Sequence, residues 1–176
     1  MITPKRSIVC PYCTRIAQLV TGEIAVPRHK EMWSKRFWFC GHCNASVRAF
    51  PNGTPMGLLA TPRIRYLRKQ AHDQFDALWQ DPKRAGFVIK TEADLYVTQS
   101  KMRKRCYTWL ADVLQMTREE AHFGMMTSEA LLIAVAEMCR QADPLDIRTR
   151  YGGAMARNTQ EFRTPFRKQA QDRRSA

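Results

Sequence analysis

The stretch that decides the fold of this chain runs from residue 10 to residue 43, and each of its ends is a Cys-x-x-Cys pair. The first pair reads Cys10-Pro-Tyr-Cys13 and the second reads Cys40-Gly-His-Cys43. A gap of two residues lets the backbone turn back, so that both sulfur atoms of a pair point at one ion. The two knuckles, separated by 26 residues, predict a tetrahedral four-cysteine site for one zinc ion. Thiolates fill all four positions, so the predicted Zn²⁺ is structural and not catalytic.

The residues around the second knuckle and between the two pairs read as short β-strands. We expect strands at residues 16–20 and 23–26, which flank a turn at 21–22, while residues 37–39 lead into the second knuckle and residues 45–50 leave it. Together these segments predict a three-stranded zinc ribbon over residues 1–58. Because so small a ribbon has little core, the metal is expected to supply much of its folding energy.

Residues 59–145 predict a helical region, so the fold class is α+β with three to four helices packed on the ribbon. A helix is expected to begin at Thr61-Pro62 and to end at Asp81-Pro82, because apolar residues recur at spacings of three or four between them. Further helices are expected over residues 100–115 and from residue 127 or 128 to 143, with a capping-box pattern at 117–120. Residues 83–99 show no clear pattern. The apolar helical registers of Cys106 and Cys139 predict buried core thiols.

The composition places a flexible basic tail after the folded body and predicts a cytoplasmic protein. Residues 146–176 contain only three residues of the Leu, Ile, Val and Phe class, and they carry eight basic against three acidic residues. The longest apolar run spans seven residues, from Ala130 to Ala136, whereas about 20 are needed to cross a bilayer. We therefore expect no membrane attachment, and a reducing compartment in which paired cysteines bind metal.

The charge distribution predicts a polyanionic partner. The chain has 29 Lys and Arg against 16 Asp and Glu, and the excess lies at both ends of the sequence, whereas residues 71–145 are slightly acidic. Nucleic acid, either DNA or RNA, fits such a surface because phosphate neutralisation supplies most non-specific affinity. The predicted contacts are basic side chains of the ribbon and of the first helix, with two aromatic side chains that could stack on bases: Arg15, Lys35, Arg36, Arg48, Arg63, Arg65, Arg68, Lys69, Tyr12 and Trp33.

Two other interpretations of these charges stay open. The basic residues near the knuckles could balance the net charge of −2 that four thiolates and one Zn²⁺ create, and those of the first helix could be an ordinary solvated face. Arg65 and Arg68 lie off the apolar stripe of that helix, so replacing both by glutamate is expected to weaken nucleic-acid binding without unfolding the chain.

Catalytic motifs are absent from the sequence, which favours a non-enzymatic role. The chain contains no G-x-x-x-x-G-K-[ST], no H-E-x-x-H and no G-x-S-x-G pattern. The leading hypothesis is a zinc-ribbon protein that binds nucleic acid. The alternative is an effector that binds a host protein, such as RNA polymerase or a defence nuclease, and inhibits or redirects it.

Six motifs in a fixed order resemble the zinc-finger-containing domain family of phage and prophage proteins, which has no established activity. The resemblance covers roughly residues 8–140 and implies a viral origin and a bacterial-host cytoplasm. Where the family pattern has glycine after the first knuckle, this chain has Thr14. The motifs are Cys10-Pro-Tyr-Cys13, Phe37-Trp38-x-Cys40-x-x-Cys43, Gly53-Thr54-Pro55-x-Gly57-x-Leu59-Ala60, Ala71-His72-x-x-Phe75-Asp76-x-Leu78-Trp79, Tyr107-x-Trp109-Leu110-Ala111 and His122-Phe123-Gly124-Met125.

Overall fold

A computed structural model describes residues 7–152 of the chain. Backbone contacts divide the protein into two compact units. Unit 1 comprises residues 1–72 and 123–136, and unit 2 comprises residues 73–122 and 137–176. The chain crosses between the units three times.

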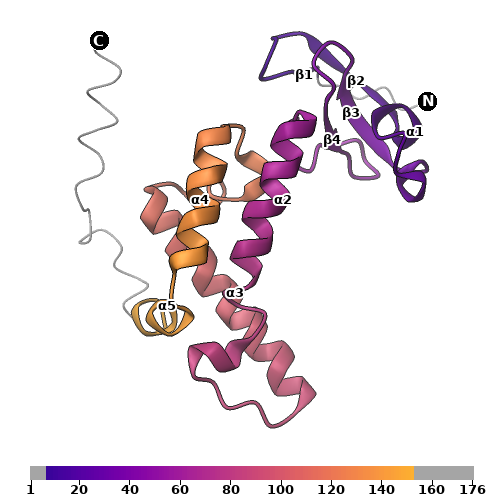
Figure 1. The fold of residues 1–176 in the computed structure, drawn as a ribbon. Helices are drawn as coiled ribbons and strands as arrows, with labels where there is room; N and C mark the ends of the chain where they lie inside the picture. Colours follow the sequence, from indigo (N-terminus) through magenta and orange to yellow (C-terminus); the bar gives the residue numbers. More distant parts are fainter. Residues whose placement is uncertain (1–6, 153–176) are drawn as a thin grey trace, which may run out of the picture. The chain divides into compact units, whose positions relative to one another are not determined.

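The amino-terminal part of unit 1 is an antiparallel sheet of four strands, not the three that we predicted from the sequence. The strands lie in the order β1 (Ile8–Val9), β2 (Ile16–Thr21), β3 (Arg36–Cys40) and β4 (Ala45–Arg48) (Figure 1). The sequence missed β1 because a two-residue strand leaves no alternation of apolar and polar residues to detect. Its two residues pair with Ala17 and Ile16 of β2.

The register of the sheet places its small core on one face. Leu19 of β2 lies opposite Trp38 of β3, which lies opposite Val47 of β4. This face packs a cluster that consists largely of small side chains. Its buried members are Cys10, Ala17, Trp38, Cys40, Ala45, Ala49 and Leu59.

The strand predicted at residues 23–26 is wrong, because helix α1 (Gly22–Ala25) occupies this segment. A Cβ atom on Gly22 would lie 1.9 Å from the carbonyl oxygen of Met32, so the two backbones meet where only glycine fits. This contact turns the chain into α1 and then into the short helix η1 (Lys30–Met32). α1 contacts β2 and β3, and Figure 1 shows it beside β3.

The first long helix, α2 (Pro62–Asp76), begins where the sequence predicted. The hydroxyl of Thr61 accepts a hydrogen bond from the amide of Ile64 at 3.2 Å, as an N-cap residue does. The predicted apolar stripe is buried throughout. The helix ends five residues before the predicted Asp81-Pro82, which instead starts the short helix η2 (Pro82–Ala85).

Unit 2 contains a longer helix than the sequence predicted. α3 spans Glu92–Leu114, whereas the predicted start was Ser100. Thr91 and Asp94 form a complete capping box at its true start. The first turns expose apolar side chains such as Tyr96 and Val97, which hid the helical period from the sequence.

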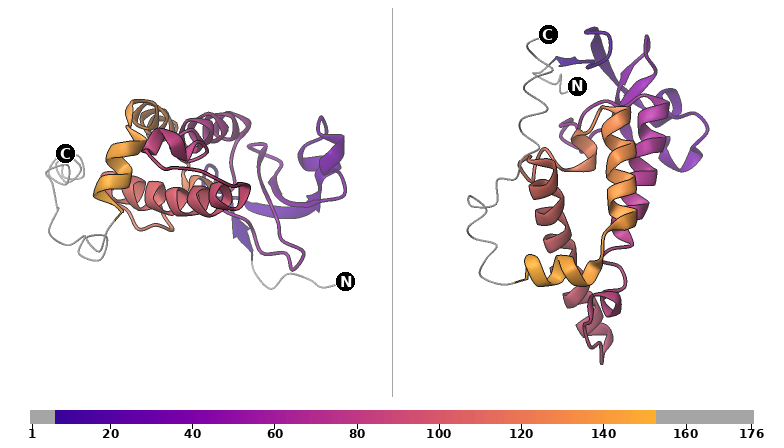
Figure 2. Two further views of the ribbon diagram at one scale, coloured as in Figure 1. Left: turned by 90° about the horizontal axis from the view of Figure 1, so that it is seen from below. Right: turned by 60° about the vertical axis from the view of Figure 1, so that its left-hand side comes forward.

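The last predicted helix is confirmed as α4 (Glu129–Gln141), and Ser128 accepts a hydrogen bond from Leu131 before it. The ordered chain continues past Asp143-Pro144, because Asp143 caps a further helix, α5 (Pro144–Arg150). Ile147 of this helix is buried, so the first residues of the predicted tail belong to the folded body. α5 contacts η2 and α3, and both views of Figure 2 show it beside α3. The remainder of the predicted tail, residues 153–176, lies outside the described residues.

The predicted capping box at residues 117–120 forms its hydrogen bonds, but it belongs to a turn before η3 (Phe123–Met125) and not to a regular helix. Cys106 and Cys139 are buried in the core, as predicted, and burial raises the pKa of both thiols to about 12. Within residues 7–152, no helix has both the length and the apolar character needed to cross a bilayer.

Candidate metal centre and basic surface

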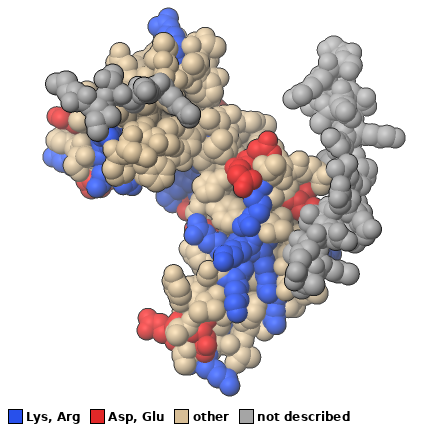
Figure 3. Space-filling model, turned by 180° about the vertical axis from the view of Figure 1, so that it is seen from behind, with Lys and Arg blue, Asp and Glu red and all other residues tan. Residues whose placement is uncertain are grey.

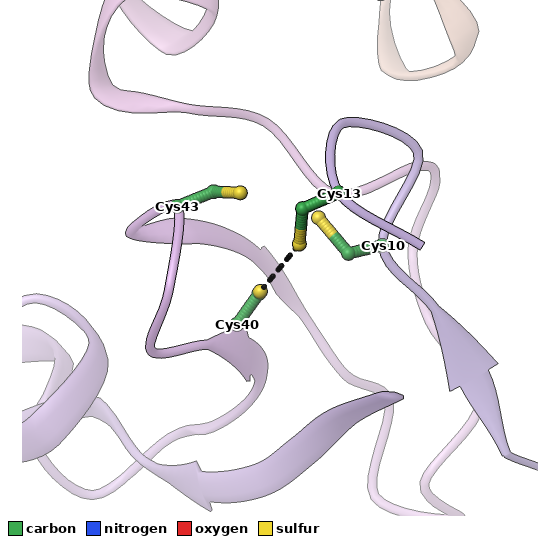
Figure 4. A group of neighbouring side chains, drawn as sticks. All are labelled: Cys10, Cys13, Cys40 and Cys43. Atoms are coloured by element: carbon green, nitrogen blue, oxygen red, sulfur yellow. Dashed lines mark hydrogen bonds between the residues drawn. The ribbon is translucent and has the colours of Figure 1, made fainter. Parts of the chain in front are cut away.

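The four predicted zinc ligands converge on one point beside the sheet. The first knuckle contributes Cys10 and Cys13, Cys40 ends strand β3, and Cys43 lies in the turn that follows it (Figure 4). Their sulfur atoms all lie within 4.8 Å of one another. Tetrahedral coordination with Zn–S bonds of about 2.3 Å requires sulfur atoms about 3.8 Å apart. The donor set and its spacing therefore fit one zinc ion.

The sulfur atoms are arranged for a metal and not for a disulfide. The Sγ atoms of Cys13 and Cys40 approach to 3.5 Å, far beyond a covalent S–S bond of about 2.05 Å. All four cysteines carry free thiols. Several neighbouring thiolates would repel one another, and a divalent metal offsets this repulsion.

The backbone of the second knuckle stabilises a thiolate at Cys40. Burial alone would raise the pKa of this thiol, but hydrogen bonds from the Cys43 amide, from Cys13 and from the His42 amide outweigh burial and lower its pKa to about 7. The pKa of the Cys43 thiol rises to about 12, first because it hydrogen-bonds Cys13 and then because of burial. A bound divalent cation favours the thiolate form of all four cysteines, because metal ligation requires deprotonated thiols.

Unit 1 is therefore a four-cysteine metal-binding fold of the zinc-finger class, with a small antiparallel sheet holding two Cys-x-x-Cys knuckles. The chain belongs to the zinc-finger-containing domain family, whose pattern matches residues 6–141. It holds one structural zinc ion through Cys10, Cys13, Cys40 and Cys43. No curated protein and no solved structure matches the chain significantly.

Both knuckles end in a residue with left-handed backbone, and the two residues differ in how well they tolerate it. The φ angle is 61° at Thr14 and 54° at Asn44, each directly after the second cysteine of its pair. Asparagine adopts this region readily, whereas a β-branched residue is strained there. The Thr14 hydroxyl donates to the Cys13 carbonyl at 2.7 Å, which offsets only part of the strain.

Replacing Thr14 by glycine is expected to stabilise the zinc-bound protein by about 0.5–1 kcal/mol, because relief of strain exceeds the added entropy of the unfolded chain. The matched control is Asn44→Gly, which changes the same position of the other knuckle and is expected to leave stability nearly unchanged. Denaturant unfolding of both variants in excess zinc measures the difference. An equal effect at the two positions would contradict the strain argument.

Most predicted basic contacts lie on the surface of unit 1, but they do not share one face of the sheet. Arg15 and Lys35 are exposed beside the sheet. Arg36 lies on the face of Trp38, where its guanidinium donates to the carbonyl of Pro51, and Arg48 lies on the opposite face, across from Phe37. Arg36 and Arg48 therefore point to opposite faces of the sheet. Both stay predicted contacts, but they could only contact different parts of one ligand.

Arg65 and Arg68 are engaged within unit 1. The Nη1 atom of Arg65 donates to the Ser46 hydroxyl and to the Ala60 carbonyl, both at 2.8 Å. Arg68 donates from Nε to the Met126 carbonyl at 2.8 Å and from Nη1 to the Leu58 carbonyl at 3.1 Å. Both guanidinium groups hold the fold, so their replacement by glutamate would also disturb the structure and cannot test binding alone.

The predicted aromatic contacts differ in availability. The hydroxyl of Tyr12 donates to the carbonyl of Leu59 at 3.2 Å, and this side chain also packs on the core of the sheet. Trp33 is about one-third exposed, and its indole donates to the carbonyl of Pro27 at 3.2 Å. Trp33 is therefore better placed than Tyr12 to meet a ligand.

One aromatic residue of the surface, Tyr66 on α2, was not among the contacts predicted from the sequence. Its side chain is 54% exposed, and the guanidinium carbon of Arg63 lies 5.9 Å from its ring centroid. Arg63, Tyr66 and Lys69 are all solvent-accessible, and their spacing of three places them along one side of the helix. The signal was present in the sequence, since Tyr66 is the aromatic residue off the apolar stripe between two predicted basic contacts.

Proposed function

We propose that this protein binds nucleic acid through unit 1, in a non-enzymatic role that the structural zinc ion supports. The observation that carries the proposal is the accessible side of α2 formed by Arg63, Tyr66 and Lys69, here called the α2 face. Basic side chains that flank an exposed aromatic ring suit a phosphate backbone with unpaired bases, because the cations contact phosphates while the ring stacks on a base.

The charge of unit 1 supports this assignment. Its described residues carry ten Lys and Arg against three Asp and Glu, so a net positive charge remains after the −2 of the zinc–thiolate cluster. In addition, Arg63 forms an ion pair with Glu129 at 3.2 Å in which both side chains are more than half exposed. So exposed a pair is worth at most about 1 kcal/mol and gives way readily to a phosphate.

Substitutions on the α2 face test the proposal. The double variant Arg63→Gln, Lys69→Gln is expected to bind a fluorescein-labelled single-stranded 30-mer, as DNA or as RNA, about tenfold more weakly at moderate salt, since two phosphate contacts are lost. Tyr66→Ala is expected to weaken binding by about tenfold through lost stacking, whereas Tyr66→Phe keeps the ring and the affinity. Fluorescence anisotropy measures both effects.

The control for charge is Lys90→Gln with Arg118→Gln, which removes two exposed cations of unit 2. If the two double variants weakened binding equally, the affinity would come from the overall positive charge of the protein and not from the α2 face. An unchanged affinity of the α2-face variants, or no binding by the wild-type protein at moderate salt, would refute the proposal.

A specific observation favours the second candidate function, an effector that binds a host protein. Val9 and Ile16 are direct cross-strand partners, and their side chains are 56% and 66% exposed. Exposed apolar pairs of this kind suit a protein interface. Salt separates the two functions, because phosphate contacts give a log–log slope of about −0.7 to −0.9 each, whereas apolar anchors respond far less to salt.

A further inference from the structure

Unit 2 has no net charge over its described residues, but its folded structure gathers cations on one side. The described residues of unit 2 contain eleven basic and eleven acidic residues. Nevertheless, Figure 3 shows Lys and Arg side chains gathered over α3 on the face turned toward the viewer. A sum over the sequence cannot reveal such a patch, because the acidic residues lie elsewhere.

Four residues form this patch, which we call the α3 basic face: Lys101, Lys104, Arg105 and Arg148. Lys104 and Arg105 lie three and four positions after Lys101 on α3, so both share a side of the helix with it. Arg105 and Arg148 lie over the ring of Phe87, with guanidinium carbons 5.7 Å and 4.0 Å from its centroid. Phe87 thus brings the α5 residue Arg148 beside the cations of α3.

The cations of this face are not neutralised by their own helix. No acidic residue stands three or four positions from Lys101, Lys104 or Arg105 on α3, and Lys101 has like charges at both spacings. Among residues 7–152, the side chains of Lys101 and Lys104 have no hydrogen-bond or ion-pair partner. The nearest carboxylates along this side of the helix are already occupied, since Asp94 accepts from the Thr91 amide and Asp112 accepts from the Tyr151 hydroxyl at 2.6 Å.

Such an arrangement costs folding stability, because like charges at these spacings repel one another on a helix. Arg105 and Arg148 have structural contacts of their own, since Arg148 donates to the carbonyls of Ala85 and Gly86 and Arg105 donates to that of Gly152. Within the described part of the chain, no comparable contact explains Lys101 and Lys104, which are both exposed to solvent.

We propose that the α3 basic face binds the phosphate backbone of a nucleic acid, as a second contact region in addition to that of unit 1. This inference rests on the proposed function and extends it to unit 2. Two features favour a phosphate chain as the ligand. The cations are spaced along a helix side and can meet successive phosphates, and the chain that continues from Gly152 carries six basic residues against two acidic ones over residues 153–176.

The test uses the full-length, zinc-loaded protein and the labelled single-stranded 30-mer. Lys101→Gln with Lys104→Gln is expected to weaken binding about fivefold at moderate salt and to make the salt dependence shallower by about 1.4 log units per log unit, since each single-strand phosphate contact contributes about 0.7. Glutamine has nearly the helix propensity of lysine, so the fold is kept. The thermal midpoint is expected to stay the same or to rise, because like-charge repulsion is removed.

The variant Lys90→Gln, Arg118→Gln again serves as the control of equal charge, and it is expected to keep the wild-type slope and affinity within about twofold. An unchanged slope for the Lys101 and Lys104 variant, together with weakened binding by the α2-face variant, would overturn the α3 face and leave the proposed function intact. Equal losses of affinity in the Lys101 and Lys104 variant and in its control would also overturn the assignment of the α3 basic face. If wild-type protein does not bind the 30-mer at all, both assignments fail.

Discussion

Replacing Cys40 by serine is expected to abolish zinc binding and to unfold the sheet of unit 1. The core of this sheet consists mainly of alanine and cysteine side chains around Trp38, and such a cluster buries too little apolar surface to hold four short strands. Zinc binding to zinc-finger peptides supplies about 10–16 kcal/mol near neutral pH, and this free energy is folding free energy. Loss of one of four thiolates removes most of it.

Two measurements check this expectation. Native mass spectrometry is expected to show one zinc per wild-type chain and none bound to the variant. The indole N–H of Trp38, which donates to the carbonyl of Gly53 at 2.8 Å, is expected to lose its dispersed NMR signal in the variant and in wild-type protein treated with a chelator. Cys106→Ala is the matched control, because it removes a buried thiol outside the cluster and is expected to keep both the zinc and the signal. A dispersed Trp38 signal without metal would contradict the argument.

Replacing Arg68 by alanine is expected to lower the free energy of unfolding by about 2–3 kcal/mol, since hydrogen bonds from a charged group are among the stronger ones and the bond to Met126 is partly buried. Its guanidinium joins Leu58, before α2, to Met126, before α4, although 68 residues separate them in the sequence. Without the side chain, both carbonyls lose their donor.

Denaturant unfolding of the zinc-bound protein measures this effect, and two further variants interpret it. Arg68→Lys keeps the charge but cannot reach both carbonyls with a rigid fork, so it is expected to recover only part of the stability. Arg63→Ala removes a neighbouring arginine in an exposed ion pair and is expected to cost less than about 1 kcal/mol. Full recovery by lysine would show that charge alone matters at this position.

The metal site could be predicted completely from the sequence because its information is local. A two-residue gap between cysteines fixes the direction of both sulfur atoms, whatever the rest of the chain does. The starts of α2 and α4 were also predictable, since Thr61 and Ser128 satisfy amides within their own first turns. In each of these cases a short motif determines the local structure, and the zinc site consists of two such motifs 26 residues apart.

The features that the sequence did not reveal depend on distant contacts or on weak local patterns. The backbone of Gly22 packs against the carbonyl of Met32, ten residues away, so a strand-like pattern folded as α1 instead. Arg65 and Arg68 donate hydrogen bonds to carbonyls elsewhere in unit 1. Their positions on the helix, off the apolar stripe, predicted instead that both side chains would be free to contact a ligand. The α3 basic face depends on how the folded chain places its charges, and the net charge of a stretch of sequence does not contain this information.

The discontinuous course of the chain through unit 1 sets an order for events during synthesis. The four zinc ligands have all left the ribosome once residue 43 has emerged, whereas the bonds from Leu58 to Gly124 and from Arg68 to Met126 must wait for the far segment. The 50 residues between the two segments of unit 1 take about 3–10 s to translate at common rates. For that interval, the nascent ribbon depends on its metal before the rest of its own unit exists.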